Sequence, residues 1–319
     1  MIVLQLIKNY DKEIKIDWIV EREYKGLLYS HPDINNIISI NLKKAKKQNS
    51  FFLLLSEFKK IPKIGSYDLV IDMQGLIKSA LISRLIKAPI KIGFNRFSVR
   101  ESLASIFYNK TFDYGYEKNV IERNVALIDF AFGFNTTNKE IENKLPFLFP
   151  NKFFLNTSLS ATKKNILLIP GASFKSKRYP VEKFIDLTNK IDANFIILWG
   201  NKNEKSIAIE IQHQSNNTSV NVSDKLSIEA LISLISQVDL VIGPDTGPTH
   251  IAWALNVPSI TLFGATSGLR NTYKTEINKV IESESIVDPR KINKNDYSIK
   301  NISVIQVVKI AILLLGIKQ

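Results

Sequence analysis

Short apolar runs rich in isoleucine, leucine and valine alternate along the chain with stretches whose apolar residues recur every three or four positions. The first pattern predicts β-strands, and the second predicts helices with one buried face. We expect strands at residues 14–20, 36–42, 67–73, 164–170, 194–200, 219–223, 239–244 and 259–264, and helices at residues 76–87, 181–191, 227–238 and 248–255. Several strands are apolar throughout, as in a parallel sheet covered on both faces. The alternation therefore predicts a doubly wound α/β fold.

A stretch rich in Pro, Asn, Ser and Thr, residues 146–165, interrupts this rhythm and is typical of a linker between two α/β series. We expect one domain over residues 1–155 and a second over residues 156–319. Ligands of such folds bind where the strands end, so the loops after the strands of the second series are the places to search. The apolar end of the chain, residues 303–319, predicts a packed helix rather than a membrane anchor, because Lys309 interrupts it.

The chain of 319 residues has a formal net charge of +13, and both halves carry the excess of lysine and arginine. An even positive field suits anionic small substrates or anionic lipid, but a compositional bias toward Lys, Asn and Ile would also produce it. It does not indicate a basic nucleic-acid-binding arm. The chain has no cysteine, which excludes disulfides and thiolate zinc sites and fits a reducing compartment. The three histidines, His31, His213 and His250, lack metal-ligand spacing.

One strand runs directly into Gly-Pro-Asp-Thr-Gly-Pro-Thr-His and then into a helix. Asp245 or Thr246 can cap that helix, and Pro248 suits its first position. Unpaired N–H groups at a helix start attract phosphate, Gly247 would let a ligand approach the backbone, and His250 offers a donor from the first turn. A well-capped helix with a structural histidine is the alternative interpretation.

A second strand runs into a small-residue loop that carries Ser173, Lys175, Lys177 and Arg178. The loop lacks the spacing of a Walker A motif. Lys177 could neutralise a leaving diphosphate as a point charge, and a solvated basic loop is the alternative. Neither G-x-G-x-x-G nor Asp-x-Asp occurs in the chain, so a bound diphosphate would have to be met by protein groups alone.

The first half holds scattered basic residues near the ends of its elements: Lys78, Arg96, Arg100, Lys118 and Arg123. Such residues most often solvate a surface. If several of them converge, they would suit an acidic acceptor, because arginine grips carboxylate and phosphate with two parallel hydrogen bonds.

Four segments together resemble the family 9 glycosyltransferases. DTGPTH (245–250) followed by FGAT (263–266) is similar to the nucleotide-sugar motif of that family, and DMQGLIKSA (72–80) and RESLASIFY (100–108) resemble the acceptor domain of the member that adds the first heptose. The resemblance implies a GT-B architecture of two doubly wound Rossmann-like domains that face a central cleft. It also implies a cytoplasmic enzyme, peripheral at the inner face of the membrane, that works without a cofactor, a metal or nucleic acid.

The implied reaction moves L-glycero-D-manno-heptose from ADP-heptose to the Kdo of Kdo-lipid A, with inversion, so the first domain would bind the acceptor and the second the ADP-sugar. The implied donor-binding residues are Ser173, Lys177, Glu204, Leu226, Asp245, Thr246, Gly247 and His250. The acceptor candidates are Lys78, Arg100 and Arg123, and the catalytic candidates are Lys177 and Asp245.

The family opens with a strand and a Ser-x-Gly-Asp loop that carries the expected general base, whereas residues 1–10 here are similar to the helix after that loop. We therefore expect the base to be missing from this chain and Met1 to be an internal methionine of a longer natural protein. Loss of that strand, which is central in a doubly wound sheet, would leave its two neighbours unpaired.

Three alternatives remain open at this stage. One is the related enzyme that adds the second heptose, and another is a nucleotide-sugar epimerase of the same architecture, which needs no acceptor. A third is a binding protein that uses its positive field on nucleic acid, for which steeply salt-dependent binding would be the sign.

Overall fold

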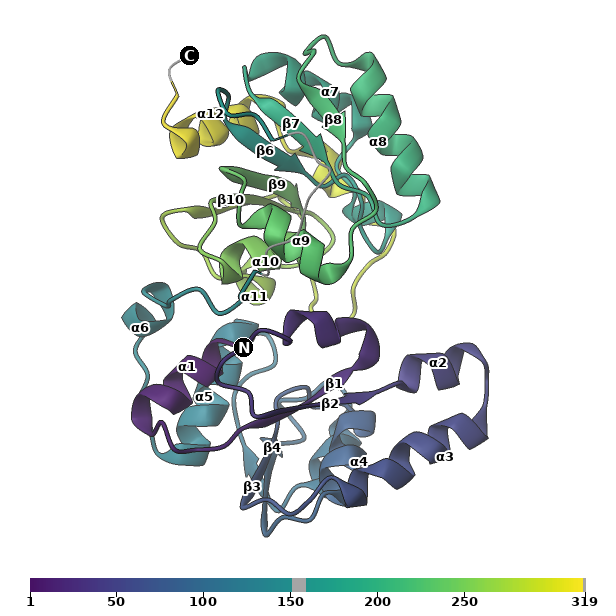
Figure 1. Ribbon diagram of the computed structural model, residues 1–319, viewed down its shortest axis with the longest axis vertical. Coiled ribbons are helices and arrows are strands. Elements are labelled where there is room, and N and C mark those ends of the chain that lie inside the picture. Colours follow the sequence, from purple (N-terminus) through teal and green to yellow (C-terminus); the bar gives the residue numbers. More distant parts are fainter. Residues whose placement is uncertain (151–158, 318–319) are drawn as a thin grey trace. The chain divides into compact units, whose positions relative to one another are not determined.

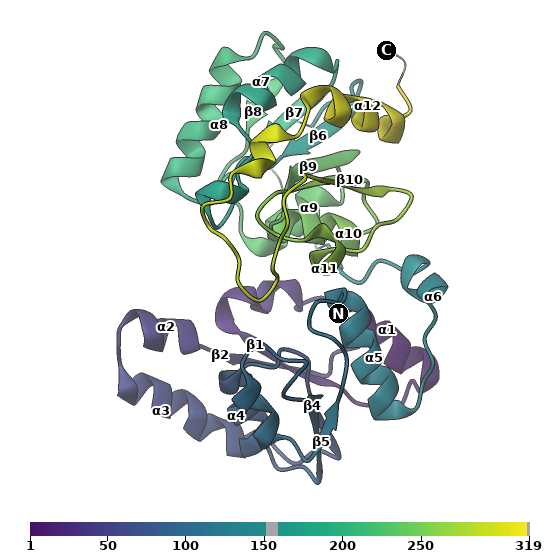
Figure 2. The same cartoon turned by 180° about the vertical axis from the view of Figure 1, so that it is seen from behind.

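The computed structural model describes residues 1–150 and 159–317, and the chain in it divides into two compact units, Met1–Lys144 and Leu145–Gln319. Figures 1 and 2 show the helices and strands of both units from opposite sides. The predicted domain boundary at residue 155 lies outside the described residues. The second unit begins ahead of it, because the Phe147 backbone N–H donates to the Ala254 carbonyl (3.0 Å) and the Phe147 ring packs edge-on against Trp253.

The first unit contains two separate parallel sheets, β1-β2 and β3-β4-β5. Its strands are β1 (Asp17–Glu21), β2 (Asn36–Ile40), β3 (Leu69–Asp72), β4 (Ile90–Phe94) and β5 (Lys110–Phe112). Its α-helices are α1 (Ile2–Tyr10), α2 (Leu42–Lys47), α3 (Phe51–Lys60), α4 (Ile77–Leu85), α5 (Val120–Phe132) and α6 (Asn138–Glu142), and short 3₁₀ helices span Arg22–Leu27, Ile61–Lys63 and Ser102–Phe107.

Among the described residues, β1 pairs only with β2, and β3 pairs only with β4. A cavity of about 1470 Å³ is lined by all of β1 and all of β3, together with residues of α1 and α4. No described strand joins β1 to β3, and each of the two pairs with one other strand, so the expected loss of a shared central strand stays a prediction. The proposed upstream start of the natural protein stays a prediction.

The second unit is a single parallel sheet in the order β11-β10-β9-β6-β7-β8. Its strands are β6 (Asn165–Leu168), β7 (Asn194–Ile197), β8 (Val220–Val222), β9 (Leu240–Pro244), β10 (Ser259–Phe263) and β11 (Asn278–Glu282). Its α-helices are α7 (Val181–Lys190), α8 (Lys202–Gln214), α9 (Ile228–Ile235), α10 (Gly247–Ala254), α11 (Gly268–Asn271) and α12 (Val304–Leu315), with 3₁₀ turns η4 at Lys175–Lys177 and η5 at Ser298–Asn301.

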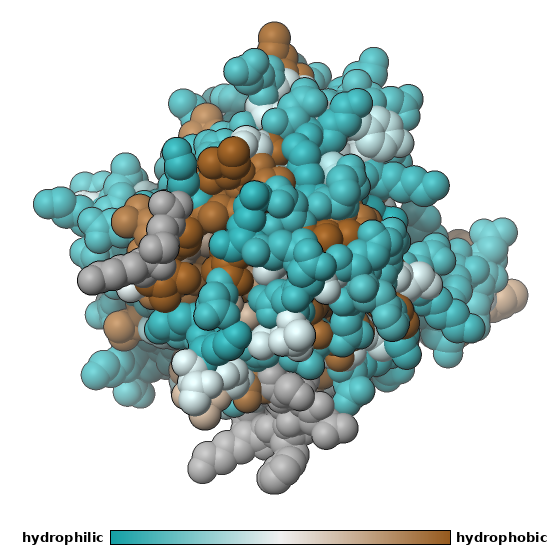
Figure 3. Space-filling model, turned by 90° about the horizontal axis from the view of Figure 1, so that it is seen from above, coloured by the Kyte–Doolittle hydropathy of each residue, from teal (hydrophilic) through white to brown (hydrophobic). Residues whose placement is uncertain are grey.

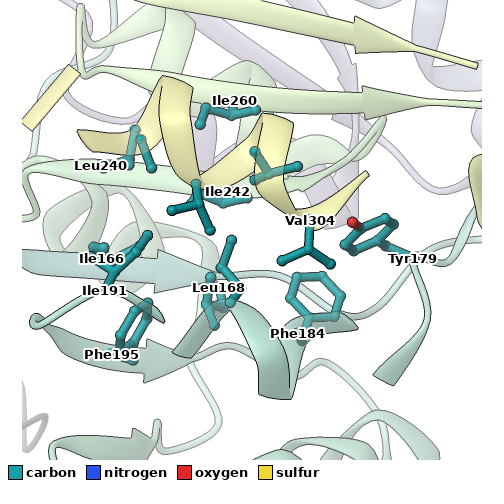
Figure 4. Packing of buried hydrophobic residues seen from close by; sticks show 14 of the residues in the cluster. Ile166, Leu168, Tyr179, Phe184, Ile191, Phe195, Leu240, Ile242, Ile260 and Val304 are labelled. Carbon is teal, nitrogen blue, oxygen red and sulfur yellow. The ribbon is translucent and has the colours of Figure 1, made fainter. Parts of the chain in front are cut away.

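Every residue of β6, β7, β9 and β10 is buried, as the apolar pattern of these strands predicts for a sheet covered on both faces. Figure 4 shows Leu240 and Ile242 beneath α12, and Ile166 and Leu168 on the neighbouring strand, in one cluster with Phe184 of α7 and Val304 of α12. The predicted packed helix at the end of the chain is confirmed, because α12 is part of this core. No helix in the described part of the chain is long and apolar enough to cross a membrane.

The surface of the molecule seen from above shows how polar and hydrophobic residues are distributed outside the core. The face seen in Figure 3 is mostly hydrophilic, with hydrophobic residues between the polar ones. A single sheet with helices packed on it and a polar exterior is the arrangement that lets the loops after the strands carry the chemistry.

Candidate functional site

The strand order of the second unit places two candidate loops next to each other. The chain runs from β6 outward through β7 and β8, and then returns to β9 on the other side of β6. The boundary between β6 and β9 is therefore a topological switch point, where ligands of doubly wound folds bind. The loop after β6 carries Lys177, and the loop after β9 carries Asp245.

The Asp245 carboxylate is the centre of this site, because four side chains from the segments that follow β6, β9 and β10 donate to it. Lys177 Nζ lies 2.8 Å from Asp245 Oδ2, and the same oxygen accepts from Thr266 Oγ1 (2.9 Å) and Asn271 Nδ2 (3.1 Å). His250 Nε2 lies 3.0 Å from the other oxygen, Oδ1. One carboxylate thus joins the loops that follow β6, β9 and β10.

The electrostatics of this cluster keep Asp245 ionised. The residue is only 7% exposed, and burial alone would raise the pKa of its carboxyl. The hydrogen bond from His250 and the charge of Lys177 outweigh burial and hold that pKa well below its usual range. Since an ionised carboxylate only accepts hydrogen bonds, His250 Nε2 must carry the proton in this contact. Its imidazole is therefore oriented by Asp245, with the side chain still 40% exposed.

Lys177 is held in place by an ion pair that leaves N–H donors of its ammonium group available to a ligand. It ends the 3₁₀ turn η4, its side chain is only 11% exposed, and Asp245 is its ionic partner. An ammonium has three N–H donors, so one ion pair leaves capacity for phosphate oxygens. Phe174 lies beside it, with its ring centroid 6.0 Å from Lys177 Nζ and 5.1 Å from Lys294 Nζ. A second lysine thus approaches the same loop.

At the start of α10, the backbone of Thr246 is hydrogen-bonded by the Thr249 side chain and not by a charged side chain. The Thr249 hydroxyl accepts from the Thr246 backbone N–H (3.3 Å) and lies 2.8 Å from the Thr246 carbonyl. Gly247, the first helical residue, is exposed, and a Cβ added there would meet nothing within 4 Å. The structure therefore leaves open space at the helix start, where unpaired N–H groups favour an anion.

The remaining donor candidates lie outside the Asp245 cluster, Ser173 and Leu226 in loops and Glu204 in the first turn of α8. Ser173 is exposed on the loop after β6. Glu204 accepts from the Gly200 backbone N–H (2.8 Å), and a Cβ on Gly171 would lie 2.5 Å from the Glu204 carboxyl carbon, so Glu204 adjoins the same loop. Leu226 is half-buried in the loop after β8. Their contacts with a nucleotide stay predictions.

The three acceptor candidates differ in their surroundings. Lys78, at the start of α4, and Arg100 are both exposed. Arg123 is only 4% exposed: its guanidinium donates to the Gly115 carbonyl (2.6 Å), the Ser98 carbonyl (2.6 Å) and the Tyr114 carbonyl, and it stacks on the Phe94 ring. These contacts tie the loop that leads to Arg100 onto α5.

Sequence reasoning missed two members of the site. Asn271 lies in α11 with no motif to mark it, and Lys294 comes from a long segment after β11. Thr266 stands at the end of the FGAT motif, so the motif was the signal that could have identified it as a partner of Asp245. Nowhere in residues 1–150 and 159–317 do three His, Cys, Asp or Glu side chains come together as a metal site would require.

Two α/β units with parallel sheets, the second with a lysine at its switch point, agree with the GT-B class of glycosyltransferase. The sequence profile described as glycosyltransferase family 9 (heptosyltransferase) matches residues 57–293. Lipopolysaccharide heptosyltransferase 1 of Campylobacter coli is 35% identical over 332 residues, which cover 99% of this chain and 94% of that protein. The chain therefore belongs to glycosyltransferase family 9, and it is a glycosyltransferase.

More distant relatives and solved structures agree. Lipopolysaccharide heptosyltransferase 1 of Escherichia coli K12 is 26% identical over 79% of each chain. The fold is similar to that of the E. coli heptosyltransferase WaaC with ADP (TM-score 0.78, 21% identity, 98% of this chain and 94% of that one). It is also similar to a family 9 glycosyltransferase from Veillonella parvula (TM-score 0.82, 19% identity, 99% and 92% covered).

Proposed function

We propose that the protein transfers L-glycero-D-manno-heptose from ADP-heptose to the Kdo of lipopolysaccharide, with inversion at the anomeric carbon. The family assignment and the name of the Campylobacter coli relative support heptose transfer in lipopolysaccharide synthesis. A solved structure of the E. coli enzyme with ADP-2-deoxy-2-fluoro heptose supports an ADP-linked donor.

The observation that carries the proposal is the buried Lys177 ammonium, held by Asp245 at the switch point between β6 and β9. When the glycosidic bond to the donor breaks, negative charge builds up on the departing ADP. A fixed ammonium and the open start of α10 would stabilise that charge without reorganising in the transition state. Ser173, Thr246 and His250 would add donors around the diphosphate, and Glu204 and Leu226 would contact the ribose and adenine.

Asp245 serves this reaction as a positioning residue. A general base works best when its pKa lies near the operating pH, whereas the pKa of Asp245 is held far below that. Four donors also occupy its two oxygens. Asp245 would thus orient Lys177 and His250 toward the donor rather than take the proton of the acceptor hydroxyl.

On the acceptor side, exposed Lys78 and Arg100 would meet the carboxylate of Kdo or the phosphates of lipid A. Buried Arg123 would act through the loop that it holds, by way of its bond to the Ser98 carbonyl, two residues before Arg100. A lipid-linked acceptor also implies a cytoplasmic protein that makes peripheral contact with the inner membrane surface.

The open space at Gly247 gives a prediction that separates ligand binding from folding. Gly247→Ala should keep or slightly raise stability, by up to about 1 kcal/mol, because alanine suits a helix better and has room here. The same methyl group should weaken ADP binding about tenfold by keeping the diphosphate from the backbone. Calorimetric titration with ADP and thermal melting check the two effects. Unchanged ADP affinity would show that the helix start is not the diphosphate site.

Titration with ADP-heptose against UDP- and GDP-linked sugars, followed by a transfer assay with and without a Kdo acceptor, tests the function. We expect preference for ADP-heptose and product only with the Kdo acceptor, with both unaffected by a chelator. Turnover without any acceptor would favour an epimerase, and transfer only to an acceptor that already carries heptose would favour addition of the second heptose. RNA binding with a steep salt dependence and no donor affinity would contradict the proposal.

A further inference from the structure

Helices α2 and α3 form a hairpin that exposes aromatic side chains. Figures 1 and 2 show the two helices side by side at one edge of the first unit. Asn49 in the left-handed region (φ 46°) turns the chain between them, and the Ser50 hydroxyl accepts from the Leu53 N–H to begin α3. Phe51 and Phe52, at the start of α3, are 66% and 85% exposed.

The hairpin is anchored by its other side, so the exposure of these rings is not the result of a detached segment. Leu42 of α2 and Phe58 of α3 pack against the buried side chains of Ile40 and Ile61. The outward positions of α3 hold Phe52, one turn before Leu55, which is also exposed. An amphipathic helix in a folded protein normally turns such residues inward.

Lysines surround this apolar tip. Residues 42–63 contain seven lysines, Lys43, Lys44, Lys46, Lys47, Lys59, Lys60 and Lys63, and one acidic residue, Glu57. Lys43 pairs with Glu23, and Lys60 pairs with Glu57. In the part of the chain that the structure describes, no carboxylate pairs with Lys44, Lys46, Lys47 or Lys59, and all four are exposed.

Exposed phenylalanines among unneutralised lysines match the surface of an anionic bilayer. Aromatic and aliphatic side chains enter the boundary between headgroups and acyl chains, and nearby lysines are attracted to the negative lipid headgroups. Nucleic acid would use the lysines, and unpaired bases can stack on phenylalanine, but nucleic acid would give no reason for exposed Leu55 on the same hairpin. Lipid therefore accounts for both features of the surface.

We propose that the α2–α3 hairpin docks the protein on an anionic lipid bilayer, with Phe51, Phe52 and Leu55 in the interface and the α2 lysines at the headgroup phosphates. The proposal rests on the proposed function in one respect: a lipid-linked acceptor is the reason for the protein to bind a membrane. The contact itself is argued from the exposure and charge of the hairpin, and its test needs neither donor nor acceptor.

Co-sedimentation with phosphatidylcholine vesicles, with and without phosphatidylglycerol, tests the docking. Wild type should bind the anionic vesicles and lose this binding in high salt. Phe51→Ser with Phe52→Ser should weaken binding about tenfold or more, and Lys46→Glu with Lys47→Glu should do the same. The control for the two phenylalanine substitutions is Leu313→Ser, because Leu313 is an exposed apolar residue of α12. Lys139→Glu with Lys309→Glu, both exposed, makes the same change in net charge elsewhere and controls for the second.

Equal losses in the hairpin variants and their controls would overturn the proposal, since binding would then follow overall charge and hydrophobicity. Binding of the phenylalanine variant to anionic vesicles with wild-type affinity would also overturn the proposal. RNA binding that is lost in the lysine variant, without any vesicle binding by wild type, would assign the surface to nucleic acid instead. Each hairpin variant should keep wild-type ADP affinity, because the hairpin lies in the first unit and the proposed donor site lies in the second. If wild type itself fails to bind ADP-heptose, the proposed function fails independently of the vesicle result.

Discussion

Replacing Lys177 with methionine is expected to lower the turnover number of heptose transfer about 100- to 1000-fold, the usual cost of removing one fixed group that stabilises a developing negative charge. The reason is the position of the Lys177 ammonium at the switch point between β6 and β9. Lys177 Nζ lies 2.8 Å from Asp245 Oδ2, and this ion pair holds it there. Steady-state kinetics at saturating ADP-heptose measures the effect, and circular dichroism establishes that the variant is folded.

Lys175 offers a matched control in the same 3₁₀ turn. Its side chain is exposed, whereas that of Lys177 is buried. Lys175→Met should change turnover less than about threefold, because a solvated lysine contributes little to a fixed charge. If Lys177→Met is folded and its turnover number is within about twofold of wild type, a change of about 0.4 kcal/mol in the barrier, Lys177 does not meet the leaving group.

Replacing Asp245 with asparagine should lower the free energy of unfolding of the second unit by about 3 kcal/mol, because it leaves a buried lysine without its counter-charge. The control is Asp192→Asn, which breaks the ion pair with Lys163 at a carboxylate that is 85% exposed, and which should cost less than about 1 kcal/mol. Urea unfolding in a Trp18→Phe background measures both, since the remaining tryptophans, Trp199 and Trp253, lie in the second unit.

The same variant should show how the stability depends on pH. The pKa of Asp245 is lowered in the folded state, so its ionisation stabilises the fold above the unfolded pKa of about 3.9 and ceases to do so as the pH falls toward the folded value. The difference between wild type and Asp245→Asn should therefore stay constant at neutral pH and shrink below about pH 4. A difference that shrinks between pH 8 and pH 6 instead would mean that another group controls the stability of this site.

The strands and helices with a strong apolar period are predictable from the sequence, and all eight expected strands and all the expected helices are present. Three strands, β4, β5 and β11, were missed. In β4 (Ile90–Phe94), Lys91 and Gly93 alternate with the apolar residues, and lysine and glycine are more typical of a loop than of a buried strand. The structure buries Lys91, and it needs glycine at position 93 because a Cβ there would lie 2.3 Å from the Tyr108 ring. This packing comes from a residue far along the chain, so no local pattern contains it.

The loops of the candidate site are predictable for the same reason as the strands, since each follows an apolar run and precedes a helix. What the sequence does not contain is the strand order. The pairing of Lys177 with Asp245 exists only because β9 returns to lie beside β6, and the contribution of Asn271 needs β10 beside β9. Local patterns therefore located the candidate residues, and the topology determined which of them meet.

The cavity between β1 and β3 has a consequence for how the two halves of the chain unfold. Each of these strands is hydrogen-bonded to a neighbouring strand on one side only, whereas β6 and β9 are bonded on both sides within one continuous sheet. Separating β1 or β3 from its neighbour breaks one ladder of backbone bonds, and separating β6 or β9 breaks two. Local opening thus costs less free energy at β1 and β3 than at β6 and β9, so we expect the backbone amides of β1 and β3 to exchange with solvent before those of β6 and β9.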